Sequence, residues 1–211
     1  MNRWRHMREV LAAAENTYTE LKNLCVWTKT NAGMGSLYRS GYEFVFAFKN
    51  GEAPHINNVE LGRFGRNRSN VWHYAGVTAF IKDRKAELGM HPTVKPLALV
   101  ADAIMDCSNR GTLVLDAFAG SGTTLMAAER TGRKGYGIEI EPHHADTILR
   151  RFDCLYGLKA VHTQSNKSLE AIESERLGKA GHGQGSKERH GRRKGDNSSG
   201  RPKYGAKNRP R

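Results

Sequence analysis

The sequence predicts an α/β fold with a Rossmann-like parallel sheet, on the evidence of one strand, one glycine-rich loop and one helix. Residues 113–116 read LVLD, a short apolar run that ends in an acid, as a strand buried on both faces of a parallel sheet does. Residues 117–122 read AFAGSG, and the following TTLMAAERTG has a helical pattern that ends at Gly132. A strand, a glycine loop and a helix N-terminus in this order form the ligand crevice of a doubly wound fold.

The glycine loop matches neither of the two common phosphate-binding signatures. Gly120 and Gly122 allow a tight turn and a close approach to a ligand, and Thr123 or Thr124 can cap the helix. The dinucleotide fingerprint needs a third glycine and the Walker loop needs a lysine, and both are missing here. Asp116 would repel a pyrophosphate. It suits a ligand with a cationic end, such as the amino and sulfonium groups of S-adenosylmethionine.

Two further segments flank the loop. GRKGYGIEIEP (132–142) predicts a second strand whose end carries Glu139, about twenty residues after the loop, where an acid can accept hydrogen bonds from both ribose hydroxyls. HPTVKP (91–96) precedes LALVADAIMDCS, which has the apolar spacing of an amphipathic helix. Taken singly, Glu139 could be an exposed acid at the end of a strand, and His91 and Lys95 could be solvated surface residues.

In this order and spacing, the segments resemble the DNA methyltransferases that modify the exocyclic amino group of adenine or cytosine. The likeness is to the permuted order, in which the cofactor half comes last. Ala117 stands where the family more usually has proline, and His144 stands where it commonly has tyrosine. The resemblance implies these cofactor-binding residues: His91, Thr93, Lys95, Asp116, Phe118, Gly120, Ser121, Gly122, Thr123 and Glu139.

The same resemblance implies a Rossmann-like S-adenosylmethionine-dependent methyltransferase fold and a role for several of these residues. Asp116 would hold the methionine end of the cofactor or orient the loop. Phe118 would pack near the methionine or adenine portion, and Glu139 would bind the ribose. The family's reaction transfers the methyl group by direct displacement to the exocyclic nitrogen of a flipped base, with adenine favoured here over cytosine.

The amino-terminal region predicts one helix and two strands. HMREVLAAAENTY (6–18) has few helix breakers, and LKNLCVWTKT (21–30) and YEFVFAFKNG (42–51) are rich in aromatic and β-branched residues. In the resemblance, these strands are the later strands of the catalytic half. We therefore interpret residues 1–53 as a remnant of that half.

Residues 54–85 lie where the family places its variable DNA-reading region. Arginine side chains bind phosphates and guanine edges, and asparagine amides suit adenine, so this segment predicts contact with double-stranded DNA. The alternative is a surface loop whose arginines are merely solvated. The predicted DNA-contact residues are Arg63, Arg66, Asn67, Arg68 and Asn70.

The family's catalytic sequence, of the D-P-P-Y kind, is absent from this chain, whose six prolines are never adjacent. In the permuted order that sequence belongs upstream of residue 1, so the chain resembles the carboxyl-terminal part of a methyltransferase, and no catalytic residue is predicted within it. The missing half would supply strands of the same sheet, so an exposed edge and an uncovered apolar face are expected. A complementary catalytic half or a second copy of the chain is the expected protein partner.

The remaining chain divides into an S-adenosylmethionine-binding part, 86–165, and a basic tail, 166–211, that is predicted to be disordered. Residues 176–211 contain 12 Lys or Arg against 2 Asp or Glu, which accounts for +10 of the formal net charge of +13. Such a tail adds salt-dependent affinity for phosphates or serves only to solubilise the chain. Cys25, Cys107 and Cys154 form no C-x-x-C pair, so neither a metal site nor a disulfide is predicted. Without a membrane-length apolar run, a cytoplasmic location is expected.

Two other functions remain open from the residues. The first is a noncatalytic DNA-binding remnant, or one subunit of a split methyltransferase, and the missing catalytic sequence favours it for the isolated chain. The second is a nicotinamide-dependent oxidoreductase, which would use the loop and Glu139. The missing third glycine and Asp116 argue against the oxidoreductase.

Overall fold

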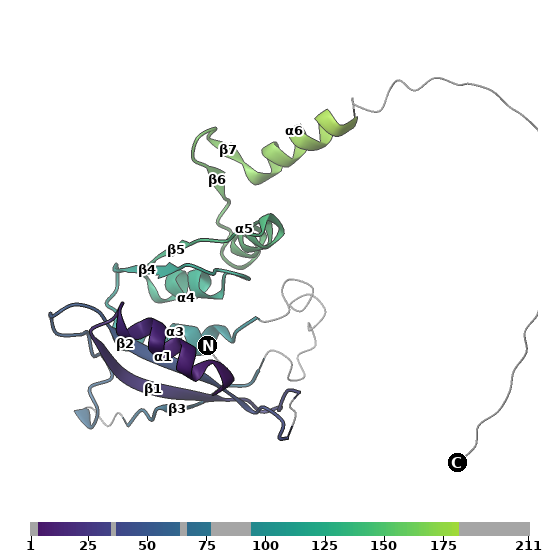
Figure 1. Cartoon of the computed structure of the whole chain (residues 1–211). Coiled ribbons are helices and arrows are strands. Elements are labelled where there is room, and N and C mark those ends of the chain that lie inside the picture. The colour runs from purple at the N-terminus through teal and green to yellow at the C-terminus, as the bar shows by residue number, and fades with distance from the viewer. Residues whose placement is uncertain (1–3, 35–36, 64–66, 77–93, 182–211) are drawn as a thin grey trace, which may run out of the picture.

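The computed structural model of this 211-residue chain describes residues 4–34, 37–63, 67–76 and 94–181 (Figure 1). Its first part contains η1 (Trp4–His6), α1 (Met7–Glu15), β1 (Glu20–Thr28), β2 (Tyr42–Lys49) and β3 (Val71–His73). β1 is the central strand of this sheet, antiparallel to β2 and parallel to β3. The predicted amino-terminal helix and its two following strands are confirmed as α1, β1 and β2.

The second part contains the predicted strand, loop, helix and strand. Its elements are α3 (Leu97–Cys107), β4 (Leu113–Asp116), α4 (Thr123–Thr131), β5 (Lys134–Gly137) and α5 (Pro142–Tyr156). β4 and β5 pair in parallel through the crossover helix α4, which is the β-α-β unit that the sequence predicted.

Helix α4 lies between the β4–β5 sheet and α3, as Figure 1 shows. The core between these layers contains Ala101 and Ile104 of α3, Ala127 of α4 and Val114 of β4. The short strand β5 reads KGYG because its glycines face α4. A Cβ on Gly137 would lie 2.9 Å from Leu125 Cδ1, so only a residue without a side chain lets the helix pack this closely.

The opposite face of the β4–β5 sheet is not covered by any described residue. Side chains alternate between faces along a strand, so Leu113, Leu115, Tyr136 and Ile138 lie away from α4. Each of them is 55–61% exposed. Neither outer edge of this sheet pairs with another strand in the described parts of the chain. The expected open edge and uncovered apolar face are therefore both present.

After α5, the short hairpin of β6 (Val161–His162) and β7 (Lys167–Ser168) leads into α6 (Leu169–Gly181), which extends from the hairpin in Figure 1. The prediction that the chain is disordered from residue 166 is therefore wrong for 167–181. Acidic side chains stabilise this helix locally, because Glu173 pairs with Arg150 of α5 and Glu175 with Lys167 of β7. Residues 182–211 lie outside the described chain. Among the described helices, none is long and apolar enough to cross a membrane.

Candidate functional site

The loop after β4 is held against the end of β5 by its own backbone. The Phe118 N–H donates to Asp116 Oδ1 at 3.0 Å, and the Gly120 N–H donates to Glu139 Oε2 at 2.6 Å. The Ala119 N–H donates to the Ile138 carbonyl at 3.0 Å. The structure thus brings Asp116 and Glu139, which are distant in sequence, to one loop at the carboxyl ends of parallel strands, where each carboxylate accepts a backbone N–H of the loop.

Gly122 ends the loop and begins α4 in a left-handed conformation, with φ of +76°. A Cβ at this position would lie 2.9 Å from both γ carbons of Ile148 in α5. The Ser121 carbonyl accepts a hydrogen bond from the Arg151 guanidinium of the same helix. Helix α5 therefore closes over this turn, and that leaves no space for a side chain at position 122.

Ser121 and Thr123 are buried, and their hydroxyl oxygens lie 3.2 Å apart. These two predicted cofactor residues bond to each other inside the loop. Their positions indicate that they shape the turn, while the backbone around them presents the helix N-terminus.

The Glu139 carboxylate is ionised and can accept further hydrogen bonds from a ligand. The backbone N–H of Glu141, at 3.0 Å, and that of Gly120 hold the pKa of Glu139 below its usual range, and His144 adds a smaller effect in the same direction. A carboxylate offers about four lone-pair sites, so two backbone donors leave room for hydroxyl donors. Glu139 can thus accept the ribose hydrogen bonds that the sequence predicted.

Phe118 presents an aromatic ring beside these acids. Phe118 is 90% exposed and lies two residues after Asp116, which ends β4. The first acid can bind the cationic amino-acid end of S-adenosylmethionine, the exposed aromatic ring can pack against its adenine, and the second acid can bind its ribose. The residues present therefore fit this cofactor.

Lys95, predicted to bind the cofactor, forms an ion pair within the protein. Its Nζ lies 3.3 Å from Glu43 Oε2, while Lys29 Nζ lies 2.5 Å from Glu43 Oε1. Both ammonium groups lie near the ring of the buried Trp27, at 5.9 and 4.9 Å from its centroid. Burial raises the pKa of Glu43, but the hydrogen bond from Lys29 and the charges of Lys95 and Lys29 outweigh it, so the pKa lies below its usual range. Lys95 thus ties the start of α3 to the three-stranded sheet. His91 and Thr93 lie outside the described residues.

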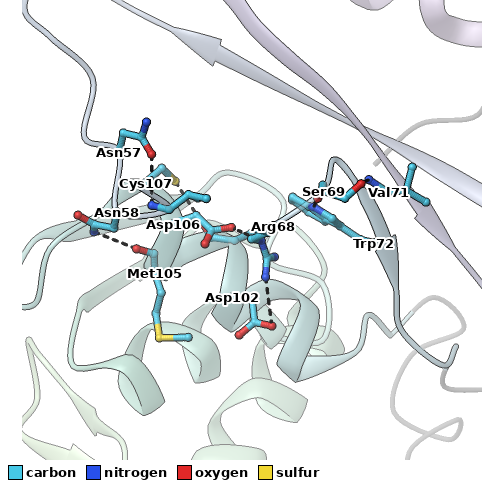
Figure 2. A network of polar contacts seen from close by, with 12 residues as sticks. Asn57, Asn58, Arg68, Ser69, Val71, Trp72, Asp102, Met105, Asp106 and Cys107 are labelled. Atoms are coloured by element: carbon cyan, nitrogen blue, oxygen red, sulfur yellow. Dashed lines mark hydrogen bonds and ion pairs between the residues drawn. The ribbon is translucent and has the colours of Figure 1, made fainter. Parts of the chain in front are cut away.

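The predicted DNA-contact residues separate into two groups. Arg68 points toward α3 in Figure 2, where its Nε lies 2.7 Å from Asp106 Oδ2 and its Nη1 lies 3.7 Å from Asp102 Oδ2. Its guanidinium carbon also lies 5.2 Å from the centroid of the Trp72 ring. Asn70 Nδ2 donates to the Leu24 carbonyl at 3.1 Å. Arg68 and Asn70 therefore anchor β3 and the loop before it to the rest of the protein.

Arg63, Asn67 and Asn70 are exposed, as a DNA contact requires. Arg63 pairs with the neighbouring Glu60 at 3.2 Å and keeps 66% of its side chain exposed. Asn67 is exposed on the loop before β3. Arg66 lies outside the described residues.

Sequence reasoning missed the residues of α3 that bind the loop before β3. Asp102 and Asp106 stand one helical turn apart, a spacing that could have signalled a cation from elsewhere in the chain. Asn58 belongs to the segment predicted to contact DNA, and its Nδ2 donates to the Met105 carbonyl at 2.9 Å, as Figure 2 shows. It also donates to the Ser108 carbonyl at 2.8 Å, just after the end of α3. Tyr74 Oη donates to the Asp102 carboxylate, so loop and helix meet through several polar groups.

Comparison with known proteins agrees with this geometry. A family model described as DNA methylase, of the N6 and N4 type, matches residues 3–150. The chain belongs to this DNA methylase family. Its relatives include the type II methyltransferase M2.MboI of Moraxella bovis, 30% identical over 145 residues, which are 65% of this chain and 51% of the relative. The DNA adenine methyltransferase YhdJ of Escherichia coli K12 is 45% identical over 84 residues, which are 40% of this chain and 27% of the relative.

A solved structure supports the fold of this methylase family member. The M1.HpyAVI–SAM complex superposes with a TM-score of 0.55 and 26% identity, covering 72% of this chain and 71% of that one. The fold class is therefore the α/β fold of the DNA methyltransferases. The chain spans about half the length of M2.MboI and about a quarter of that of YhdJ.

Proposed function

We propose that this chain binds S-adenosylmethionine and takes part in methyl transfer to the exocyclic amino group of adenine in double-stranded DNA. The observation that carries the proposal is the loop between β4 and α4, whose backbone N–H groups bond to the carboxylates of Asp116 and Glu139 beside an exposed Phe118. When bound, S-adenosylmethionine would supply the methyl group. Membership of the DNA methylase family supports the reaction class.

Each residue of this loop has a proposed part in binding. Asp116 neutralises the amino group of the methionine end, and Glu139, ionised at neutral pH, accepts hydrogen bonds from the ribose hydroxyls. Phe118 packs against the adenine or the methionine portion. Lys95 acts indirectly, since its ion pair with Glu43 fixes the start of α3.

The proposed DNA contacts are the exposed residues Arg63, Asn67 and Asn70, together with Arg66 of the same segment. Such contacts would make affinity fall as salt rises. Adenine is favoured as the target because YhdJ, 45% identical over 84 residues, is a DNA adenine methyltransferase. Cytosine is the less favoured target.

Calorimetric titration of S-adenosylmethionine into the purified chain tests the proposal. We expect saturable binding, weakened about 10- to 150-fold by Asp116→Ala or Glu139→Ala, because each loses a charge-assisted hydrogen bond that contributes about 1.5–3 kcal/mol. Asp146→Ala, which removes an exposed acid from α5, is the matched control and should bind like the wild type. Absence of binding by a chain with a cooperative unfolding transition would refute the cofactor assignment.

The second candidate is a noncatalytic DNA-binding protein or one subunit of a split methyltransferase. The face of the β4–β5 sheet that no described residue covers favours it, because a complete doubly wound sheet is covered on both faces. A methylation assay with tritiated S-adenosylmethionine and duplex DNA separates the two candidates. Incorporation of label by the chain alone would exclude the noncatalytic reading.

A further inference from the structure

Three arginines meet where α3 and α4 end, at the edge of the β4–β5 sheet away from the cofactor loop. Arg110 lies in the turn between α3 and β4, Arg130 in the last turn of α4, and Arg133 directly before β5. Both strands begin just after these residues, whereas the cofactor loop follows the carboxyl end of β4. All three arginines line one groove between α3 and α4, which we call the arginine groove, with a volume of about 410 Å³. This volume is within the range of ligand-binding clefts.

Arg133 is buried, and neutral oxygen atoms fix its guanidinium group. The residue is 9% exposed. Its Nη2 donates to the Ser108 carbonyl at 2.5 Å and its Nε to the Ser108 hydroxyl at 3.1 Å, directly after α3. Its Nη1 donates to the Thr131 carbonyl at 2.5 Å, at the last residue of α4. Carbonyl groups at a helix C-terminus lack partners within the helix, so Arg133 joins the ends of both helices.

Arg110 is exposed and lies across the end of α4. Its Nη1 donates to the same Thr131 carbonyl at 3.4 Å, so two guanidinium groups share one acceptor. A Cβ on Gly132 would lie 2.6 Å from Arg110 Nη2, so the glycine leaves the space that this guanidinium fills. Among the described residues, no carboxylate forms an ion pair with Arg110, Arg130 or Arg133.

The charge of the arginine groove favours an anion. Asp102 also lines the groove, but its carboxylate already accepts a hydrogen bond from Tyr74 Oη and lies 3.7 Å from Arg68 Nη1. Three guanidinium groups therefore face one carboxylate that is bound elsewhere. Like charges repel, and an anion among these groups would relieve that repulsion. Phosphate suits them best, because a guanidinium group donates two parallel hydrogen bonds to it.

We propose that Arg110, Arg130 and Arg133 form a binding site for phosphate groups, separate from the cofactor loop. The proposal goes beyond methyl transfer, because the two sites lie at opposite ends of the β4–β5 unit. Arg133 is held rigidly by its bonds to α3 and α4. Arg110 has five N–H donors, of which one makes the bond to Thr131, and Arg130 is exposed beside it.

The surroundings of the arginine groove favour the phosphodiester backbone of DNA as the source of these phosphates. A second groove, of about 500 Å³, is lined by Asn58 and Asn67 of the segment predicted to contact DNA. It shares Asp102 and Met105 with the arginine groove, so the two adjoin along α3. A nucleic-acid strand that contacts Asn67 can therefore continue to the arginines. A small phosphate compound is the other source, and two separate measurements distinguish them.

Titration of fluorescent duplex DNA with the full chain at several salt concentrations gives the first measurement. The double variant Arg110→Ala, Arg130→Ala should lower the slope of log affinity against log salt by about two, because each phosphate contact contributes about 0.9. Both residues are exposed, so the melting temperature should not change.

The matched control removes two positive charges that acids of α6 already pair. Arg150 pairs with Glu173, and Lys159 Nζ lies 4.0 Å from Glu170. The double variant Arg150→Ala, Lys159→Ala should keep the salt slope of the wild type. An equal loss in this control would mean that net charge alone sets the slope, and would overturn the proposal.

Inorganic pyrophosphate is the probe in the second measurement, since an anion that binds the folded chain raises its melting temperature. The rise should occur in the wild type and the control and disappear in Arg110→Ala, Arg130→Ala. A changed salt slope identifies DNA as the ligand, whereas an unchanged slope with a lost response to pyrophosphate identifies a small phosphate compound.

Two further results would overturn the proposal. If the variant Arg110→Ala, Arg130→Ala keeps both its salt slope and its response to pyrophosphate, the arginines serve only to join the ends of α3 and α4. If the variant melts at a lower temperature and loses S-adenosylmethionine binding as well, they support the fold rather than hold a ligand. Failure of the proposed function looks different, because a wild-type chain that binds no S-adenosylmethionine would still show the dependence on Arg110 and Arg130.

Discussion

Gly122 joins the cofactor loop to α4, and replacing it by alanine tests the packing of this turn. Its φ of +76° costs a residue with a Cβ about 1–2 kcal/mol. The added Cβ would also lie 2.9 Å from both γ carbons of Ile148, and overpacking of this kind costs about 1–3 kcal/mol. We therefore expect Gly122→Ala to lower the free energy of unfolding by about 2–5 kcal/mol, a large part of the stability of a typical domain.

Gly157 provides the matched control for this variant. It follows α5 with φ of +66°, and nothing lies within 4 Å of a Cβ built there, so Gly157→Ala carries only the conformational cost. Urea unfolding followed by circular dichroism compares the two variants. In an Ile148→Ala background, the further loss caused by Gly122→Ala should shrink to that of Gly157→Ala, because the clashing carbons are gone. Equal losses for the two glycine variants in the wild-type background would refute the proposed contact between the loop and α5.

Three further outcomes follow from the site. Arg68→Ala should lower the free energy of unfolding by about 1–3 kcal/mol, because it removes the ion pair with the partly buried Asp106. Arg63→Ala should leave thermal stability unchanged and reduce the salt slope of DNA binding by about one. The reverse pattern would show that the structure assigns the two arginines wrongly. The pKa of Glu43 is lowered in the folded chain, so the stability that its ion pairs contribute is present above its unfolded pKa and is lost as the pH falls through its folded pKa. Glu43→Gln should therefore flatten the fall in melting temperature between pH 5 and about 3. An unchanged dependence of melting temperature on pH would contradict the ion-pair cluster. Phe118→Ala should leave the melting temperature unchanged, because the ring is exposed. It should weaken S-adenosylmethionine binding about 2- to 12-fold, as measured by calorimetry. Unaltered affinity would remove Phe118 from the site.

The cofactor loop could be predicted from the sequence because its determinants are local. An apolar run ending in Asp116, glycines that permit a tight turn and a helix pattern that stops at Gly132 are all consequences of neighbouring residues. The position of Glu139 beside the loop could be predicted too, because parallel strands joined by one crossover helix end at the same edge of the sheet. The uncovered face was expected from the resemblance, and the structure shows it on Leu113, Leu115, Tyr136 and Ile138.

The orientation of the charged residues depended on contacts between distant segments. Composition favoured DNA contact for Arg68, but Arg68 pairs with acids on α3, 34 or more positions along the chain. Lys95 likewise meets Glu43 only because α3 packs near the three-stranded sheet. The same applies to α6, whose acids find partners on α5 and β7.

The sequence alone therefore determined the β-α-β unit, its glycine turn and the two acids around it, because backbone conformation and strand direction follow from short-range patterns. Tertiary structure decided which cations face solvent and which are held in half-buried ion pairs. The residues next to an arginine or lysine in sequence do not fix the direction of its flexible side chain. Its partner is the carboxylate that the packing of helices and sheets brings within reach.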